Sequence, residues 1–342
     1  MGKLNYRVGI IGCGLMGHKR AAALESFPSS KLVRVCDTNP DKAKELAAKY
    51  SCEFTADSRE VTGDKNIDLV IVSVVNSALA GLTIDSLKNS KHVLVEKPAA
   101  VSPDELAKVI KAYESFGRKF KIKVGFNHRF HPAVCKAKEI IRTGNLGEIM
   151  FIRARYGHGG RLDYDKEWRA YRKTAGGGEL LDQGSHLIDL SRYFMSEFEE
   201  AAGYFGSFFW DMEVEDNCFL LLKTKKGQIA QLHASWSQWK NAFAMEIFCR
   251  NAQIDISGLG GSYGRETLTF YKMKPEMGVP DKFVYGWDKD TSWLDEYTDF
   301  INSIEGNHEP NGSIYDAYES LKLVNKIYEG GKNGNIFGHG QY

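Results

Sequence analysis

The sequence predicts an α/β plus α+β protein: an N-terminal doubly wound Rossmann domain and a C-terminal domain on a large, open, mostly antiparallel sheet. Strand and helix patterns alternate in the first third of the chain, whereas strands later follow one another with few helices between them. A chain of 342 residues also exceeds the ~250–300 at which one hydrophobic core usually stops growing. We place the two domains at residues 1–126 and 127–342.

The first domain begins with a β-rich run that ends in glycines. Leu69–Val75 is its clearest strand, because a parallel strand covered by helices on both faces is continuously apolar. The expected strands are Arg7–Ile11, Leu32–Cys36, Leu69–Val75, His92–Val95 and Lys121–Gly125, and the expected helices are Met16–Glu25, Pro40–Tyr50, Ser77–Leu87 and Pro103–Phe116. Such alternation indicates a parallel sheet with right-handed crossovers.

The second domain opens with an expected helix at Pro132–Thr143, after which strands cluster. Short polar turns such as Lys225–Gly227 separate several of them, as in hairpins. The expected strands are Phe151–Tyr156, Cys218–Thr224, Ile229–Ser235, Ala244–Cys249 and Gln253–Ile256, and the expected helices are Glu179–Met195, Ser292–Glu305 and Ser313–Tyr328. Strands in succession favour an antiparallel or mixed sheet.

Composition narrows the class of partner. A formal net charge of +1 gives no electrostatic reason to expect nucleic acid or an anionic membrane surface. The longest apolar run is too short to span a bilayer, and the N-terminus lacks the apolar stretch of a signal peptide. The six cysteines form no C-x-x-C pair, which argues against a disulfide framework and for a reducing compartment. We expect a cytoplasmic protein.

A glycine fingerprint lies between the first expected strand and the first expected helix. Gly12, Gly14 and Gly17 form G-x-G-x-x-G, which permits a tight turn, close approach to a pyrophosphate and close helix packing. The helix start adds N–H groups and a partial positive charge. We assign Gly12, Gly14, Leu15, Met16 and Gly17 to dinucleotide binding.

An acidic residue selects between the two nicotinamide dinucleotides. Asp37 lies 20 residues after Gly17, at the end of the second expected strand, where an acid can bind the ribose diol. Its charge would repel the 2′-phosphate of NADP, so NAD is the expected cofactor. Lys42 leaves NADP open as the less favoured alternative.

Two further groups of residues suit chemistry on a substrate hydroxyl: a lysine that can hydrogen-bond the substrate oxygen and favour negative charge on it, and an Asp–His pair that can transfer its proton. Lys97, in Glu96-Lys97-Pro98, follows a strand at the sheet edge where ligands of open α/β sheets bind. Asp182 and His186 are four residues apart on an expected helix and so share a face. A histidine titrates near neutrality, and a carboxylate one turn away can orient it. The alternatives are a surface turn and a solvated Asp–His pair.

The segment before that helix is rich in arginine and aromatic residues. Trp168 and Arg169 are of the types that stack on sugars or bind anionic groups, although such aromatics also pack in cores. His128 and His131 are three residues apart, but no carboxylate or cysteine joins them in the sequence, so we predict no metal site.

The motifs together resemble one enzyme family. Gly12–Gly17, Glu96-Lys97-Pro98, Asn127-His-Arg129-Phe-His-Pro132 and Gly-Gly-Gly…Asp182-x-x-x-His186 are similar to those of the glucose–fructose oxidoreductase/inositol dehydrogenase/MocA family. The resemblance implies that Lys97, Asp182 and His186 are catalytic, that Asn76, Glu96 and Asn127 approach the cofactor, and that the Lys97–Pro98 bond is cis. Arg129, Trp168 and Arg169 are then expected to face the substrate. Val75 and Leu79 depart from the family pattern, which usually carries proline and histidine there.

The resemblance implies an NAD(P)-dependent dehydrogenase that acts on a secondary hydroxyl of a cyclic sugar, sugar derivative or polyol, such as inositol, a sugar acid or a nucleotide sugar. It also implies a homodimer or homotetramer. An NAD-dependent glycosidase would share this fold and cofactor but release an aglycone without accumulating NADH. A non-catalytic NAD-binding protein would need only the glycine fingerprint, so Lys97, Asp182 and His186 argue against it.

Overall fold

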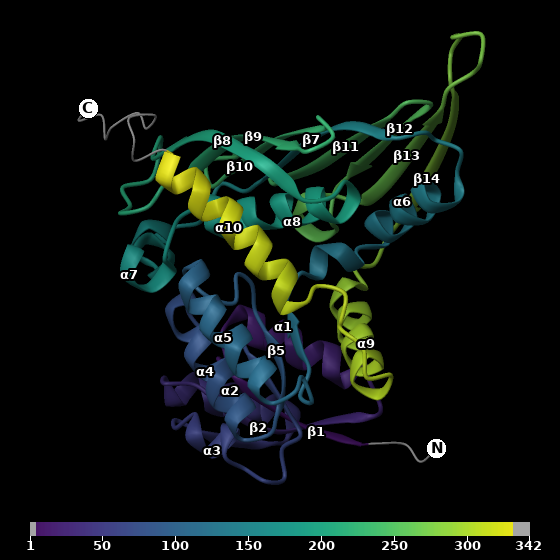
Figure 1. Cartoon of the computed structure of the whole chain (residues 1–342). Coiled ribbons are helices and arrows are strands. Elements are labelled where there is room, and N and C mark those ends of the chain that lie inside the picture. The colour runs from purple at the N-terminus through teal and green to yellow at the C-terminus, as the bar shows by residue number, and fades with distance from the viewer. Residues whose placement is uncertain (1–4, 331–342) are drawn as a thin grey trace. The chain divides into compact units, whose positions relative to one another are not determined.

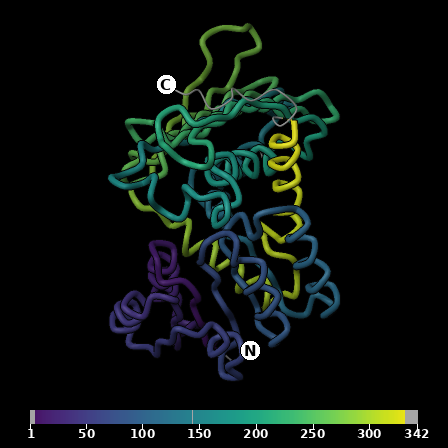
Figure 2. Tube along the Cα trace, turned by 90° about the vertical axis from the view of Figure 1, so that its left-hand side faces the viewer, coloured from purple at the N-terminus to yellow at the C-terminus, as the bar shows by residue number. Residues whose placement is uncertain are grey.

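The computed structural model describes residues 5–330, which divide into two compact units (Figure 1). The first unit runs through Asn127 and also contains Trp293–Tyr318, and the second contains His128–Ser292 and residues 319–330. The expected boundary is therefore one residue from the observed one. The assignment of all later residues to the second domain is wrong for 293–318, because helix α9 (Ser292–Glu305) buries Tyr297, Phe300 and Ile301 in the core of the first unit. Figure 2 shows this late segment beside the start of the chain.

The first unit is built on a parallel sheet of six strands in the order β3-β2-β1-β4-β5-β6, which is the doubly wound Rossmann order. The strands are β1 (Tyr6–Ile11), β2 (Ser30–Cys36), β3 (Glu53–Thr55), β4 (Leu69–Val72), β5 (His92–Val95) and β6 (Ile122–Val124). All four residues of β4 are buried, as expected for a central strand covered on both faces. The predicted fold of this unit is confirmed.

The helices of the first unit begin where the sequence supplies caps. Asn39 accepts backbone N–H groups at the start of α2, and Ser102 does so for α5. Both helices have proline in the first turn. The helices are α1 (Leu15–Glu25), α2 (Pro40–Tyr50), α3 (Arg59–Thr62), α4 (Asn76–Lys88), α5 (Pro103–Ser115) and α9. Residues of α1, α2 and α9 share one apolar cluster with β1, β2, β4 and β5.

The second unit is built on an eight-stranded sheet in the order β14-β13-β12-β11-β7-β10-β9-β8. Every pairing is antiparallel except that of β7 with β10, so the predicted mostly antiparallel sheet is confirmed. The strands are β7 (Ile149–Gly157), β8 (Phe198–Gly206), β9 (Asn217–Thr224), β10 (Ile229–Ser235), β11 (Ala242–Cys249), β12 (Ala252–Ser257), β13 (Glu266–Lys272) and β14 (Asp281–Trp287).

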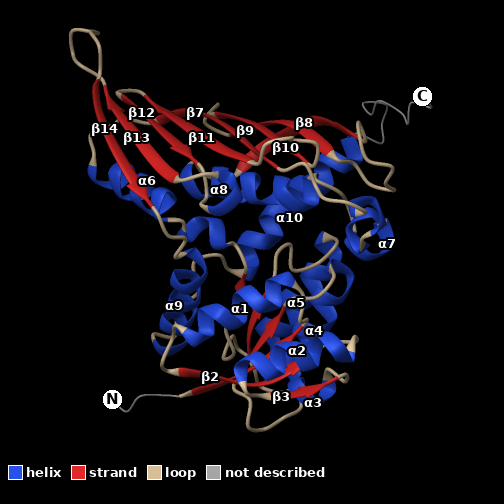
Figure 3. Cartoon of the chain, turned by 180° about the vertical axis from the view of Figure 1, so that it is seen from behind, coloured by secondary structure: helices blue, strands red, loops and turns tan. Residues whose placement is uncertain are grey.

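Helices α6 (Pro132–Thr143) and α8 (Ser185–Phe194) lie against one face of this sheet (Figure 3). The other face exposes apolar side chains, among them Phe219, Leu221 and Val284. The remaining helices are α7 (Arg172–Ala175) and α10 (Ile314–Gly330). Within the described part of the chain, no helix combines the length and apolar character needed to cross a membrane.

Candidate functional site

The three glycines of the fingerprint are required for different reasons. Gly12 has φ +101°, and a Cβ atom there would lie 2.2 Å from the carbonyl oxygen of Ser73. A Cβ on Gly17 would lie 2.1 Å from the carbonyl oxygen of Gly12. A Cβ on Gly14 would meet no atom within 4 Å, so this glycine leaves open space in front of helix α1. Packing thus dictates Gly12 and Gly17, and Gly14 provides room for a ligand.

The start of α1 is suited to an anion. Its N-cap residue, Gly14, makes no side-chain capping bond, and no acidic residue lies in the first turn. Leu15, the first helical residue, is 66% exposed, and Met16 is half-buried. A helix start without a capping side chain offers its N–H groups and partial positive charge to a phosphate. These residues fit the pyrophosphate of a dinucleotide.

Asp37 is fixed beside this turn. It follows β2, and its two carboxylate oxygens accept the backbone N–H groups of Cys13 and Asn39, each at 2.8 Å. Burial and the Asp37 carboxylate raise the pKa of the Cys13 thiol to about 12. The thiol is therefore neutral near pH 7 and adds no negative charge to the anion-binding turn.

Lys97 is half-buried and follows β5 at the carboxyl edge of the parallel sheet. The Lys97–Pro98 peptide is cis, as the resemblance implies. The preceding Glu96 is buried, and its Oε1 lies 2.6 Å from Nη2 of Arg20, which also pairs with Glu296 of α9. Glu96 is thus held in a buried ion pair within the unit. Of the other expected cofactor residues, Asn76 is half-buried at the start of α4, and Asn127 is buried at the start of a short 3₁₀ turn.

The segment that carries Asp182 and His186 is not one regular helix. Leu180–Gly184 forms a π-helical turn in which the N–H of Gly184 bonds to the carbonyl of Glu179 at 2.8 Å, and α8 begins only at Ser185. The expected helix over Glu179–Met195 is wrong in this respect, because an i→i+5 bond inserts one residue into the turn. Such turns are frequent at functional sites.

His186 lies in a group of rings. It is 6% exposed, and its imidazole stacks on that of His128 with ring centroids 3.9 Å apart. Tyr156 of β7 packs against both rings, at 5.1 Å from His128 and 6.2 Å from His186. His131, the neighbour of this group, bonds to Glu266 at 2.9 Å. Across residues 5–330, no group of three or more His, Cys, Asp and Glu side chains is arranged to hold a metal ion.

Neutral polar groups lie next to Asp182. Nδ1 of His158 accepts the N–H of Gly160 at 2.9 Å, which leaves the ring proton on Nε2, 3.2 Å from the amide oxygen of Gln183. Burial lowers the pKa of His158, so its imidazole is neutral near pH 7. With its amide oxygen toward His158, Gln183 donates a hydrogen bond from its amide nitrogen to Glu179 at 2.7 Å. Burial raises the pKa of Tyr263, which packs on Tyr156, to about 12.

Three of the expected site residues come together. Nε of Arg169 lies 3.6 Å from Oδ2 of Asp182, and the Arg169 guanidinium lies over the Trp168 ring at 4.5 Å from its centroid. About a quarter of the Arg169 and Asp182 side chains is exposed, which leaves both accessible to a ligand. We call Asp182, Arg169, Trp168, His158, Gln183 and His186 the polar cluster. Its hydrogen-bonding groups suit a ligand rich in hydroxyls.

Sequence reasoning missed several members of this region. His128 was considered only as a metal ligand, whereas it stacks on His186. His158, Gln183 and Tyr263 meet through the sheet and the π turn, and no local spacing in the sequence brings them together. The available signal was composition, since His158 lies in the segment already singled out for Trp168 and Arg169.

Two family models match this chain. A family model described as an oxidoreductase family with an NAD-binding Rossmann fold matches residues 6–124, and one described as the GFO/IDH/MocA C-terminal domain matches residues 134–255. Levoglucosan dehydrogenase of Pseudarthrobacter phenanthrenivorans is 32% identical over 205 residues, which are 57% of this chain and 52% of that protein. The match thus spans about half the length of that relative.

Other likenesses extend over nearly the whole chain. Myo-inositol 2-dehydrogenase of Thermotoga maritima is 26% identical over 330 residues, 93% of each protein. A solved structure of levoglucosan dehydrogenase in complex with NADH has a TM-score of 0.86 at 22% identity, covering 96% of this chain and 97% of that one. At this identity the structural likeness shows the fold.

Proposed function

Because this chain belongs to the GFO/IDH/MocA oxidoreductase family, with an NAD-binding Rossmann domain, we propose that it oxidises a secondary hydroxyl of a cyclic sugar, sugar derivative or polyol. The observation that supports the substrate class is the polar cluster. In it the Asp182 carboxylate lies close to a guanidinium, to neutral hydrogen-bonding side chains and to an aromatic ring. Relatives named for levoglucosan and inositol support the same class.

His186 is the proposed general base that takes the proton of the reacting hydroxyl. Its imidazole is buried against His128 and Tyr156, which fixes the plane of the ring. Asp182 is proposed to orient the reacting group, and Lys97 to stabilise the negative charge that develops on the substrate oxygen. NAD⁺, when bound, supplies the acceptor for the hydride of the alcohol carbon.

The proposed cofactor contacts follow from the first unit. Gly14, Leu15 and Met16 offer the open helix start to the pyrophosphate, and Asp37 is held beside it for the ribose diol. NAD is favoured over NADP because of that carboxylate. Glu96, Asn76 and Asn127 are proposed to lie toward the nicotinamide half, with Glu96 acting through its ion pair with Arg20 to fix the start of the Lys97–Pro98 turn.

On the substrate side, Trp168 and Arg169 are proposed to contact the sugar ring directly. Arg129 is 4% exposed and ion-paired with Asp189, so we propose that it supports the site by holding the His128 segment against α8. A homodimer or homotetramer is proposed on the exposed apolar face of the large sheet. Six free cysteines are consistent with the proposed cytoplasmic location.

The test is NADH formation by the purified protein with a panel of inositols, anhydrosugars, hexoses, sugar acids and nucleotide sugars. The proposal expects NADH absorbance to rise with at least one cyclic alcohol. Aglycone release from a glycoside without accumulation of NADH would instead indicate an NAD-dependent glycosidase. Tight NAD binding without turnover of any compound would indicate a non-catalytic role.

A further inference from the structure

A group of aromatic rings stands exposed at one end of the second unit. Phe208 is 64% exposed, Phe209 53% and Trp239 76%. The Phe209 ring meets that of Trp239 edge-on with centroids 4.9 Å apart, and that of Trp210 at 5.1 Å. We call these four side chains the aromatic shelf. Large apolar rings gathered in water are unfavourable unless a ligand or a partner covers them.

The shelf is held by a buried carboxylate. Asp216 is fully buried, and its two oxygens accept the backbone N–H groups of Phe208, Phe209 and Trp210 at 2.8–2.9 Å. The Trp210 indole N–H donates to the carbonyl of Trp236 at 2.8 Å. The loop that displays the rings is therefore preorganised, which lowers the entropy cost of binding a ligand on it.

The shelf is continuous with the polar cluster. A Cβ on Gly160 would lie 2.6 Å from the Trp210 ring, so the shelf packs directly on the chain next to His158. The N–H of Gln238, the residue before Trp239, donates to the carbonyl of His158 at 3.2 Å. The His158 ring in turn bonds to Gln183, next to Asp182. A ligand in the polar cluster that extends past His158 would meet the shelf.

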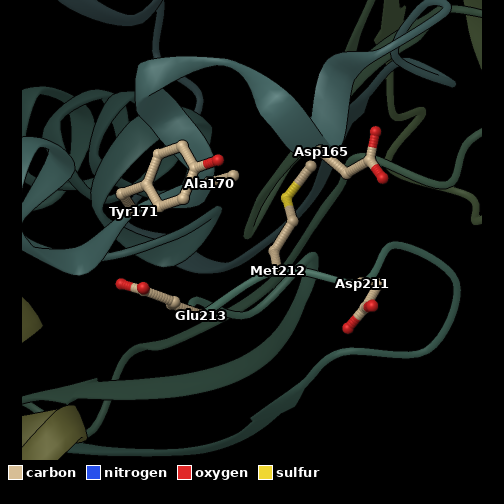
Figure 4. Close-up of a pocket in the computed structure, with 6 residues that line it drawn as sticks. All are labelled: Asp165, Ala170, Tyr171, Asp211, Met212 and Glu213. Carbon is tan, nitrogen blue, oxygen red and sulfur yellow. The ribbon is translucent and has the colours of Figure 1, made fainter.

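Acidic residues beside the shelf restrict the charge of such a ligand. An open pocket of about 250 Å³ is lined by three carboxylates, Asp165, Asp211 and Glu213, and by Ala170, Tyr171 and Met212 (Figure 4). It adjoins Trp210, because the N–H of Met212 donates to the Trp210 carbonyl at 3.1 Å. The carboxylates would repel a phosphate or a sugar acid and would accept hydrogen bonds from hydroxyls.

We propose that the aromatic shelf binds the second, non-reacting ring of an uncharged glycoside whose reacting sugar ring occupies the polar cluster. The inference rests on the proposed function and narrows its substrates to glycosides that carry a second ring. Rings that stack on or meet the edges of aromatic side chains gain attraction beyond their buried area. A methyl group in place of that second ring would cover little of the aromatic shelf and would therefore gain little affinity from it.

The experiment compares phenyl with methyl β-glycosides of glucose, galactose and mannose, titrated by calorimetry into the NADH-loaded protein. The two members of each pair share the reacting ring and differ in the second group. Wild-type protein should bind at least one phenyl glycoside about tenfold more tightly than its methyl partner, a difference of about 1.4 kcal/mol. Trp239→Ala and Phe209→Ala should each reduce that ratio towards one.

Phe283→Ala is the matched control, because Phe283 is another exposed aromatic residue (45%) but lies on β14, stacked on Phe270. It should leave the phenyl-to-methyl ratio unchanged. A ratio near one for every pair in the wild type, failure of all these glycosides to bind, or an unchanged ratio in Trp239→Ala would overturn the shelf assignment.

Two further readouts separate the possibilities. If Trp239→Ala converts an oligomer into monomers in light scattering, the shelf is an interface between copies and the assignment is wrong. NADH formation from NAD⁺ with the same glycosides and with free polyols judges the proposed function independently. A strong phenyl preference without any NADH formation would retain the shelf and refute the dehydrogenase.

Discussion

Both carboxylate oxygens of Asp189 accept hydrogen bonds from the guanidinium of Arg129. Nε of Arg129 lies 2.8 Å from Oδ2 and Nη2 lies 2.6 Å from Oδ1, with the two residues 4% and 1% exposed. The pair joins α8 to the short 3₁₀ turn that carries His128. Since His128 stacks on His186, this ion pair helps to fix the ring that we propose as the base.

Asp189→Asn should lower the free energy of unfolding by about 3–5 kcal/mol, because it leaves the Arg129 charge buried without its counter-ion. Denaturant unfolding monitored by circular dichroism measures this change. Asp163→Asn is the control, since Asp163 forms an exposed ion pair with Lys166. A loss below 1 kcal/mol in Asp189→Asn, similar to that of the control, would contradict the structural role.

Gly14→Ala and Gly17→Ala should fail in different ways. A methyl group on Gly14 meets no protein atom within 4 Å, so this variant should melt near the wild-type temperature yet bind NAD⁺ at least about tenfold more weakly. A methyl group on Gly17 would lie 2.1 Å from the Gly12 carbonyl oxygen, so that variant should lose stability. Thermal melting and calorimetric titration of NAD⁺ measure both properties. Unchanged NAD⁺ affinity in a folded Gly14→Ala protein would refute the placement of the pyrophosphate.

Asp37→Ala should weaken binding of NAD⁺ about tenfold and narrow the preference for NAD⁺ over NADP⁺, because we propose that the carboxylate binds the ribose diol and repels a 2′-phosphate. Titrations with the two nucleotides measure the ratio of dissociation constants. Asp41→Ala changes a nearby exposed acid in the first turn of α2 and should alter the ratio little. The NAD assignment fails if wild-type protein binds NADPH at least tenfold more tightly than NADH.

His92 should make the protein less stable in mild acid. Burial lowers the pKa of its imidazole to about 4, and Nδ1 accepts the N–H of Lys121 at 3.0 Å. Because the folded pKa lies below the unfolded value of about 6.5, the neutral imidazole of His92 contributes to stability. That contribution is fully present above pH 6.5 and is lost as the pH falls towards 4. Between pH 7 and pH 5 the loss is about 2 kcal/mol at most, since the ring is only partly shielded.

Unfolding at pH 7 and pH 5 should therefore show a smaller pH dependence for His92→Gln than for the wild type. His308→Gln, which changes an exposed histidine, is the control and should keep the wild-type dependence. Equal dependence in all three proteins would show that His92 is not responsible.

Local patterns were sufficient to predict most of the first unit. Pro40 and Pro103 begin their helices at the predicted residues, and the apolar run at Leu69–Val72 is a central strand. Strand β14 was missed because most of its residues are exposed, and its sequence shows no clear alternation of apolar and polar positions. The place of α9 could not be predicted, because its amphipathic pattern requires an apolar partner but does not say which unit supplies it.

Some residues of the candidate site could likewise be predicted from local sequence, and others could not. The fingerprint glycines and Asp37 follow from spacing along one strand–helix–strand unit, and the structure places Asp37 beside the glycine turn. Asp182 was expected to share a helix face with His186, and it also lies beside Arg169 of the preceding 3₁₀ turn, a contact that no helical spacing predicts. The Arg129–Asp189 pair spans 60 residues of sequence, and neither residue carries a local signal for it. Contacts of this kind depend on tertiary packing.

The measurement that tests the central claim most directly is the rate at which Lys97→Met and His186→Ala oxidise the alcohol that the wild-type protein oxidises. NAD⁺ affinity is determined on the same samples. Both variants should bind NAD⁺ as the wild type does, while kcat falls by roughly 10²–10⁴ because each removes a group proposed to act on the reacting hydroxyl. Lys88→Met, which changes an exposed lysine at the end of α4, is the control and should keep wild-type turnover. Full activity in either Lys97→Met or His186→Ala would contradict the proposed chemistry.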